Sequence, residues 1–261
     1  LMCVRRRLLS VGAAVSVALL WAALTLLLMS RPPHPVSAAP NTLYVAPPPT
    51  GDDANPCSAS DPCATVQHAV DVAHADDEIQ VATGVYTGVQ ARDGMTQVLF
   101  ISKTVTVRGG YSPGFGRWNP AAFPTTLDAQ RQGRVVSILD AGPTLEGLII
   151  TGGDATSVTL NCPTAGGVSD GCGGGVFVFG GSPLIVGNVI SGNIGARSVG
   201  SHSASGGGLL VAYGNGSVIS GNLIMSNTAS TGARGMGGGG TPVEPGEVAY
   251  STQIQIIYAI Q

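Results

Sequence analysis

GGGVFVFGGSPLIVGNVISGN, at Gly173–Asn193, is followed by a near copy, GGGLLVAYGNGSVISGNLIMSN, at Gly206–Asn227. The second half of each copy follows the pattern Ile-x-x-Asn-x-Ile-x-x-Asn. Its four positions are Ile185, Asn188, Ile190 and Asn193 in one copy, Ile219, Asn222, Ile224 and Asn227 in the next, and Leu145, Leu148, Ile150 and Gly153 in a degenerate earlier copy. Three copies indicate an internal repeat.

Each copy also begins with a strand whose apolar residues alternate with others. The alternating pairs are Val136 and Ile138, Val176 and Val178, and Leu209 and Val211. A unit of about 20 residues with two such strands cannot bury its own apolar face, whereas a stack of units can. Glycine and asparagine tolerate the left-handed backbone that tight corners require. The repeat therefore predicts an all-β fold, a right-handed parallel β-helix (solenoid).

The N-terminal half predicts the start of the same solenoid. Leu43–Ala46 is a short apolar strand, and Ala64–Ala73 has the apolar spacing of a short helix, which we expect to cap the first coil. The expected organisation is an N-terminal segment at 1–38, a strand, loop and capping helix at 39–75, β-helix coils at 76–240, and an atypical C-terminal segment at 241–261, either truncated or a degenerate cap.

A resemblance supports this fold. The segment CATVQHAVDVAHADDEIQVATGVYTG, which begins at Cys63, resembles the opening of secreted right-handed parallel β-helix proteins of the pectin-lyase-like superfamily. The glycine-led strands and apolar-x-x-Asn segments are similar to repeats of polymorphic outer-membrane proteins. The resemblance covers about residues 42–240. It implies the fold but not the activity, because the superfamily mixes lyases, hydrolases, esterases, adhesins and surface proteins.

The first 38 residues predict export. Three arginines (Arg5, Arg6 and Arg7) precede the apolar run Leu8–Met29, and Val36-Ser37-Ala38 fits a cleavage site. The segment is either a cleaved signal peptide or an uncleaved membrane anchor, and both place the remainder outside the cytoplasm, secreted or at the cell surface. We expect no other contact with membrane.

Charge narrows the expected partners. The remaining chain carries eight basic and 15 acidic residues, a formal net charge of −7. An acidic surface without basic clusters excludes nucleic acid as a partner. The expected partner is an extracellular glycan or a cell-surface protein, and the expected state is a monomer.

Four cysteines remain after the N-terminal segment, and in an exported chain they predict disulfides. Four cysteines allow three pairings. The local pairing, Cys57–Cys63 with Cys162–Cys172, is favoured because each pair lies in a short, turn-rich segment. A metal site formed by these cysteines is not expected, since no C-x-x-C spacing occurs.

Catalytic candidates are weak. Asp128, Arg131, Arg134, Asp140 and Asp154 cluster near the first full repeat. Among them, Asp128 and Asp140 with Arg134 could supply an acid–base pair beside an arginine, as glycosidic chemistry requires. The stronger alternative is that both aspartates cap turns. The motifs of pectate lyases, polygalacturonases and pectin methylesterases are absent from the sequence.

Two further groups of residues could either bind a ligand or have a purely structural role. Asp52, Asp53, Asn55 and Asp61 form an oxygen-rich loop that could hold calcium, or simply a solvated disulfide loop; no other cofactor is expected. Phe177 and Phe179 should point outward if Val176 and Val178 point inward. Their rings form a platform for a ligand such as a sugar, are covered by the preceding loop, or are simply exposed.

Three insertions, Asp154–Cys172, Ile194–Ser205 and Thr228–Met236, leave the repeat at one corner. They are rich in Gly, Ser and Thr, so we expect loops on one face of the solenoid, where binding residues concentrate. The sequence predicts a non-catalytic module for cell-surface structure, adhesion or carbohydrate binding. The alternative is a polysaccharide lyase or hydrolase with diverged or missing motifs.

Overall fold

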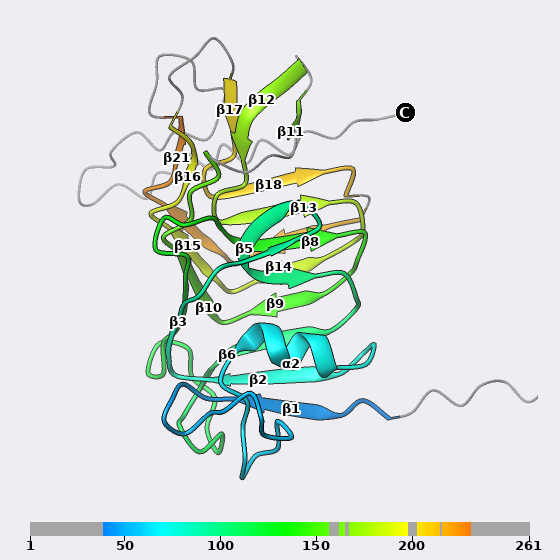
Figure 1. Ribbon diagram of the computed structural model, residues 1–261, viewed down its shortest axis with the longest axis vertical. Coiled ribbons are helices and arrows are strands. Elements are labelled where there is room, and N and C mark those ends of the chain that lie inside the picture. The colour runs from blue at the N-terminus through cyan, green and yellow to red at the C-terminus, as the bar shows by residue number, and fades with distance from the viewer. Residues whose placement is uncertain (1–38, 157–161, 165–166, 198–202, 215, 231–261) are drawn as a thin grey trace, which may run out of the picture. The chain divides into compact units, whose positions relative to one another are not determined.

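The computed structural model describes residues 39–156, 162–164, 167–197, 203–214 and 216–230. The described elements lie in one compact unit that begins at Pro40, and three parallel sheets form its walls (Figure 1). The first sheet contains β1 (Thr42–Val45), β2 (Glu78–Ala82), β6 (Thr106–Tyr111), β9 (Thr144–Glu146), β14 (Leu184–Val186) and β19 (Val218–Ser220). The second contains β3 (Gly84–Tyr86), β7 (Thr125–Asp128), β10 (Leu148–Thr151), β15 (Val189–Ser191) and β20 (Leu223–Met225).

The third sheet completes each coil. It contains β4 (Gln90–Arg92), β5 (Met95–Ile101), β8 (Arg134–Leu139), β13 (Val176–Phe179) and β18 (Leu209–Ala212). Only the β4–β5 pair in these three sheets is antiparallel. The chain visits the first, second and third sheets in turn and returns to the first one strand further along. The predicted parallel β-helix is confirmed.

Equivalent residues form continuous apolar files inside the solenoid. In the first sheet one file runs through Leu43, Ile79, Val107, Leu145, Ile185 and Ile219. In the second sheet a file runs through Tyr86, Leu127, Ile150, Ile190 and Ile224. The predicted neighbours Ile185 and Ile219, and Ile190 and Ile224, are paired in register. Burying each such side chain contributes about 1.5–3 kcal/mol, so stacking supplies the core that one repeat lacks.

Asparagine amides join successive coils at two corners. Asn188 accepts from the Leu148 backbone N–H (3.0 Å) and donates to the Leu145 carbonyl (2.9 Å) and to Asn222 Oδ1 (3.0 Å). Asn193 makes the same set of bonds with Gly153, Ile150 and Asn227. Leu148 and Gly153 occupy the asparagine positions of the degenerate copy, and their backbone N–H groups donate to the amide oxygens of Asn188 and Asn193 in the next coil. We call these two rows the asparagine ladders.

The predicted capping helix is α2 (Val66–Val72), the only helix among the described residues. It packs against β1, β2 and β5 rather than simply crossing the end of the coil. Gln67, which is buried, donates its amide to the Phe100 carbonyl (3.2 Å) and accepts from the Phe100 N–H (2.6 Å). The side chain thus satisfies backbone groups of β5 that a neighbouring strand would otherwise pair with.

The expectation that the three insertions are loops is wrong. They contain β11 (Cys162–Thr164), β12 (Gly167–Cys172), β16 (Ile194–Ala196), β17 (Ser203–Ser205) and β21 (Thr228–Ser230). These strands pair in two small sheets, with β12 parallel to β17 and β16 parallel to β21. Insertions at one register leave successive coils one strand spacing apart, so their backbones can pair across coils whatever their side chains.

Candidate functional site

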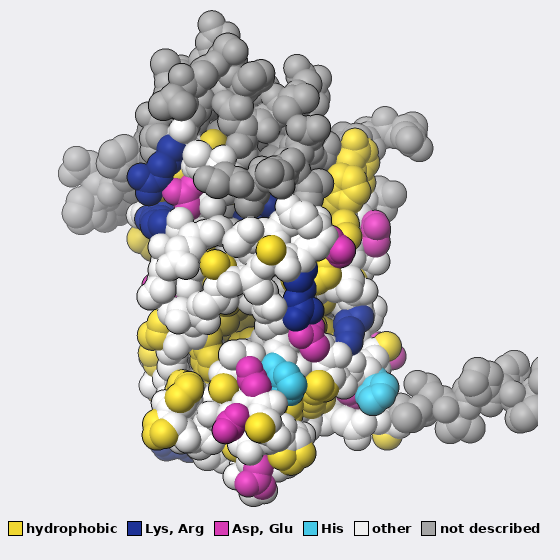
Figure 2. Space-filling view, viewed as in Figure 1, with side chains coloured by type: hydrophobic (Ala, Val, Ile, Leu, Met, Phe, Trp, Pro, Cys, Tyr) yellow, Lys and Arg dark blue, Asp and Glu magenta, His cyan; other side chains and the backbone are white. Residues whose placement is uncertain are grey.

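A pocket of about 300 Å³ lies at the corner from which the insertions leave, between the second and third sheets. Its lining residues come from four successive coils: Thr96; Arg131, Gln132 and Gly133; Asp154 and Thr156; and Arg197. We call it the insertion-corner pocket. Basic side chains flank an acidic one at the upper left of Figure 2, where β16 lies in Figure 1. The location of function on this face stays a prediction. Of the charged lining residues, Arg131 and Asp154 belong to the charged cluster noted in the sequence, whereas Arg197 does not.

Asp154 is the buried anchor of this pocket. Its side chain is 8% exposed and accepts from Arg197 Nε at 2.7 Å, while its other carboxylate oxygen accepts from the Thr156 N–H and hydroxyl. Burial alone would raise the pKa of Asp154, but these hydrogen bonds and the charge of Arg197 bring it below the usual value. The carboxylate is therefore ionised at neutral pH and committed to positioning Arg197.

Arg131 enters the pocket from the turn before β8. Gln130 and Arg131 both have a left-handed backbone, with φ of 51° and 64°. The turn is fixed by the Arg131 N–H, which donates to the Gly152 carbonyl (2.7 Å), and by Asp128, whose carboxylate accepts from the Gln130 N–H (2.8 Å). Arg131 Nη1 also donates to the Gly153 carbonyl at 3.0 Å. A non-glycine residue in this conformation costs about 1–3 kcal/mol and is more frequent at functional sites.

The predicted catalytic residues do not form one centre. Asp128 caps the turn just described, and Asp140 lies in the turn after β8, at the opposite corner of the coil. Arg134 begins β8 and Asp140 follows its last residue, so the two lie about 20 Å apart along the chain at about 3.3 Å per residue. The turn-capping alternative therefore describes Asp128 better than the catalytic one.

Arg134 is buried inside the protein wall. Its Nε donates to the Cys172 carbonyl at 2.9 Å, and its guanidinium lies 4.5 Å from the centre of the Phe177 ring. Burial lowers the pKa of Arg134 to about 10. With no exposed surface, this side chain cannot approach a substrate in this conformation.

Phe177 and Phe179 point away from the main core, as expected, but they differ in exposure. Phe177 is 1% exposed and packs in a second apolar cluster with Met95, Phe100, Cys172 and Leu210. A platform role for Phe177 is wrong, because its ring is covered. Phe179 is half-buried and makes an edge contact with the exposed Tyr213, at 5.1 Å between ring centres.

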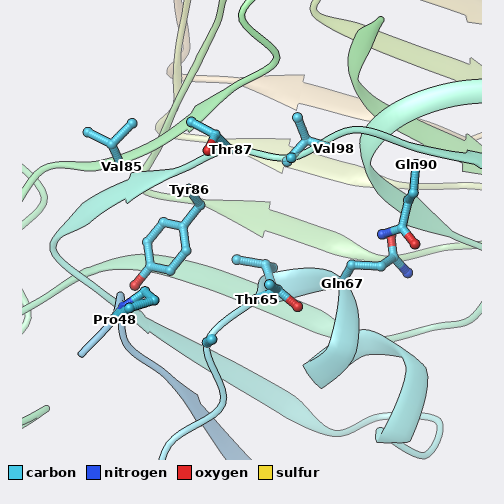
Figure 3. Close-up of a pocket in the computed structure, with 11 residues that line it drawn as sticks. Pro48, Thr65, Gln67, Val85, Tyr86, Thr87, Gln90 and Val98 are labelled. Carbon is cyan, nitrogen blue, oxygen red and sulfur yellow. The ribbon is translucent and has the colours of Figure 1, made fainter. Parts of the chain in front are cut away.

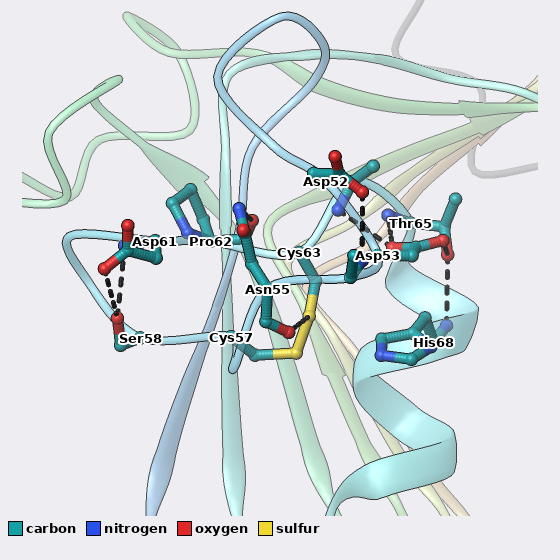
Figure 4. Close-up of a disulfide and its surroundings, with 12 residues drawn as sticks. Asp52, Asp53, Asn55, Cys57, Ser58, Asp61, Pro62, Cys63, Thr65 and His68 are labelled. Atoms are coloured by element: carbon teal, nitrogen blue, oxygen red, sulfur yellow. Dashed lines mark hydrogen bonds between the residues drawn. A yellow bond between two sulfur atoms is a disulfide. The ribbon is translucent and has the colours of Figure 1, made fainter.

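The Cys57–Cys63 disulfide is confirmed. Cys172 is also disulfide-bonded, but the side chain of Cys162 lies outside the described part of the chain, so their pairing stays a prediction. The predicted calcium residues surround the first disulfide (Figure 4).

The oxygen atoms of that loop are used locally. Asp53 accepts from the Ala64 and Thr65 N–H groups and from the Thr65 hydroxyl, which in turn caps α2 at His68. Asp52 accepts from the Ala54 N–H, the Asn55 amide donates to the Pro62 carbonyl, and Asp61 bonds Ser60. The only cluster of possible metal ligands among the described residues is Cys57, Cys63 and His68, where the disulfide removes both thiolates. The arrangement favours the disulfide-loop alternative over calcium.

A second pocket, of about 230 Å³, lies between α2 and β3 (Figure 3). Its main polar groups serve the fold: Gln67 pairs with β5, and the Tyr86 hydroxyl donates to the Ala82 carbonyl at 3.0 Å. Burial raises the pKa of Tyr86. No charged side chain lines this pocket, so it offers fewer groups for recognition than the insertion-corner pocket.

Sequence reasoning missed one exposed surface. Trp118 is 48% exposed, donates its indole N–H to the Gly109 carbonyl, and lies beside Arg108. Arg108 bridges Glu78 (2.8 Å) and Glu146 (2.7 Å) across three strands of the first sheet. Both carboxylates bond the same arginine, so Arg108, Glu78 and Glu146 form a cross-strand ion-pair cluster that stabilises the sheet. A tryptophan in a Gly- and Pro-containing loop was the available signal.

One comparison identifies a family. A family model described as Protein of unknown function (DUF1565) matches residues 49–244, three quarters of the chain. No curated protein and no solved structure matches. Among the described residues, no helix has the length and apolarity to cross a membrane. The predicted N-terminal segment 1–38 and C-terminal segment 241–261 lie outside the described residues.

Proposed function

We propose that this chain, which belongs to the DUF1565 family, is a non-catalytic β-helix module that binds a glycan or another cell-surface ligand. The observation that carries the proposal is the insertion-corner pocket, in which guanidinium, amide and hydroxyl groups from four coils meet. Binding residues concentrate where irregular segments extend from a rigid scaffold, and here the stacked coils provide that scaffold.

The chemistry of the pocket favours binding over hydrolysis. Hydrolysis of a glycosidic bond generally needs two carboxyl groups, one of them protonated to serve as the acid. Asp154 is the only carboxylate among the lining residues that the structure describes, and its lowered pKa keeps it ionised. Because that carboxylate also bonds Arg197 and Thr156, it is poorly placed to exchange protons with a substrate.

The proposed location is extracytoplasmic, secreted or at the cell surface. The Cys57–Cys63 disulfide supports an oxidising compartment. The basic and apolar N-terminal sequence supports export. Fractionation of cells that express the full chain, followed by protease treatment of intact cells, tests the location; protein found only in the cytoplasm would contradict it.

The test of function combines a glycan array with a turnover assay on neutral and uronic polysaccharides, with and without calcium. We expect the full chain to bind at least one glycan class and to release no product. Phe179→Ala is the matched variant on the third sheet, and it should leave binding unchanged if the pocket holds the ligand. Turnover that disappears in Asp154→Asn would establish the enzyme alternative.

A further inference from the structure

The insertion-corner pocket is locally basic on an acidic protein. Arg131 and Arg197 line it together with one carboxylate, Asp154, which leaves a formal charge of +1. Residues 39–261 as a whole carry a formal net charge of −7. A positive site on such a surface is not explained by general solubility, since the other charges of the chain have the opposite balance.

Both arginines are held in place while keeping hydrogen-bond donors for a ligand. Arg197 donates its Nε to Asp154 and its backbone N–H to the Thr156 hydroxyl, and these are its bonds within the described residues. Its two terminal amino groups, Nη1 and Nη2, therefore make no hydrogen bond to a described residue. Arg131 uses Nη1 for the Gly153 carbonyl and forms no ion pair within the same ranges. A guanidinium held by some of its five donors presents the rest without further ordering.

We infer that this pocket binds an oxyanion, a phosphate, sulfate or carboxylate group carried by the ligand. The inference rests on the proposed function, which places a ligand at this corner. Paired N–H donors of a guanidinium match the oxygen spacing of all three groups, and charge assistance makes such hydrogen bonds about twice as strong as neutral ones. The Thr96 hydroxyl and the Gln132 amide are further neutral donors in the lining, whereas the Thr156 hydroxyl donates to Asp154.

Titration of the full chain with sodium phosphate, sulfate and acetate, each against sodium chloride of equal ionic strength, tests the inference by calorimetry and thermal unfolding. We expect saturable binding of at least one oxyanion and none of chloride. Arg131→Gln should weaken that affinity about tenfold, equivalent to about 1.4 kcal/mol. Arg117→Gln is the matched control, because Arg117 is exposed on the loop before β7 and lines neither pocket.

The arms of the titration separate the possible sources. Preference for phosphate or sulfate assigns a phosphorylated or sulfated ligand, and preference for acetate assigns a carboxylated one. Arg197→Gln provides a second readout, and Arg131→Gln remains decisive if loss of the Asp154 pair disturbs the corner. Equal responses to oxyanions and chloride, or oxyanion binding unchanged in both variants, would overturn the inference. Glycan-array binding that survives Arg131→Gln would support the proposed function and contradict the oxyanion inference.

Discussion

The two corners that carry asparagine ladders are built alike but serve different ends. At the corner between the first and second sheets, Gly147, Gly187 and Gly221 repeat with φ of 63–69°, and Asn188 and Asn222 bond successive coils. At the corner between the second and third sheets, Asn193 and Asn227 make the equivalent bonds. In the coils that carry these asparagines, only the second corner is followed by insertions and by the charged pocket.

The difference shows how a solenoid adds a site without weakening its stack. The ladder amides satisfy the backbone N–H and C=O groups of each coil at the corner. A segment of almost any length can therefore follow the corner without leaving these groups unpaired. Gly153 links the two functions directly: its N–H donates to Asn193, and its carbonyl accepts from Arg131. The ladder thus fixes one wall of the pocket.

The largest expected effect is loss of a ladder amide. Asn188→Ala and Asn193→Ala should each lower the free energy of unfolding by about 3–5 kcal/mol. Both side chains are buried, and each truncation leaves several backbone and amide partners without a bond, at about 1–3 kcal/mol per group. Urea denaturation measures the change. Only Asn193→Ala should also reduce oxyanion binding, because only Asn193 supports the pocket wall.

Asn222→Ala supplies the control for burial. Asn222 makes the same kinds of bond, to Asn188 and to the Ile185 carbonyl, but it is partly exposed, so water can replace it. We expect a loss of about 1 kcal/mol. A loss as large as that of Asn188→Ala would mean that burial does not set the strength of the ladder.

Most of the fold could be predicted because the repeat fixes it residue by residue. The spacing of Ile185, Asn188, Ile190 and Asn193 specifies two inward apolar files and two corner amides, and each has the predicted neighbour in the next coil. Stacking leaves one register that buries these residues, so local pattern and long-range pairing agree.

The site could not be predicted to the same degree, because it depends on contacts between coils at irregular positions. Alternation correctly predicted that Phe177 points away from the core, but the residues that cover it include Met95 and Phe100 of β5, two coils earlier. The strands β16 and β21 escaped notice because each has only three residues, and these include Gly or Ala, which are depleted in strands. Arg131 and Arg197 come from different coils and share no motif.

A smaller effect is expected from pH at the insertion corner. The pKa of Asp154 is lower in the folded protein than its unfolded value of about 3.9. Its ionisation therefore contributes stability at pH above that value, and the contribution is lost as pH falls through the folded pKa. Because Arg197 is more than half exposed, we expect a contribution below about 1 kcal/mol.

Urea denaturation between pH 7 and pH 3 measures this contribution. The free energy of unfolding should fall more steeply with acid in the wild type than in Asp154→Asn. Identical slopes for the wild type and Asp154→Asn would show that the Asp154–Arg197 pair contributes no pH-dependent stability.

The smallest expected change in stability is that of Arg131→Gln. This variant distinguishes the two corners best, because it should affect binding and not stability. Arg131 is exposed, and within the described part of the chain its side chain makes one hydrogen bond, to the Gly153 carbonyl, which water can replace. The strained backbone is kept, since glutamine is no better suited to a positive φ than arginine. The free energy of unfolding should therefore change by no more than about 0.5 kcal/mol in urea denaturation without added oxyanion. With that result, a ladder residue such as Asn188 would determine stability, and the pocket residue Arg131 would determine oxyanion binding. A loss of 2 kcal/mol or so in Arg131→Gln would instead make Arg131 part of the structural corner, and the distinction between the two corners would fail.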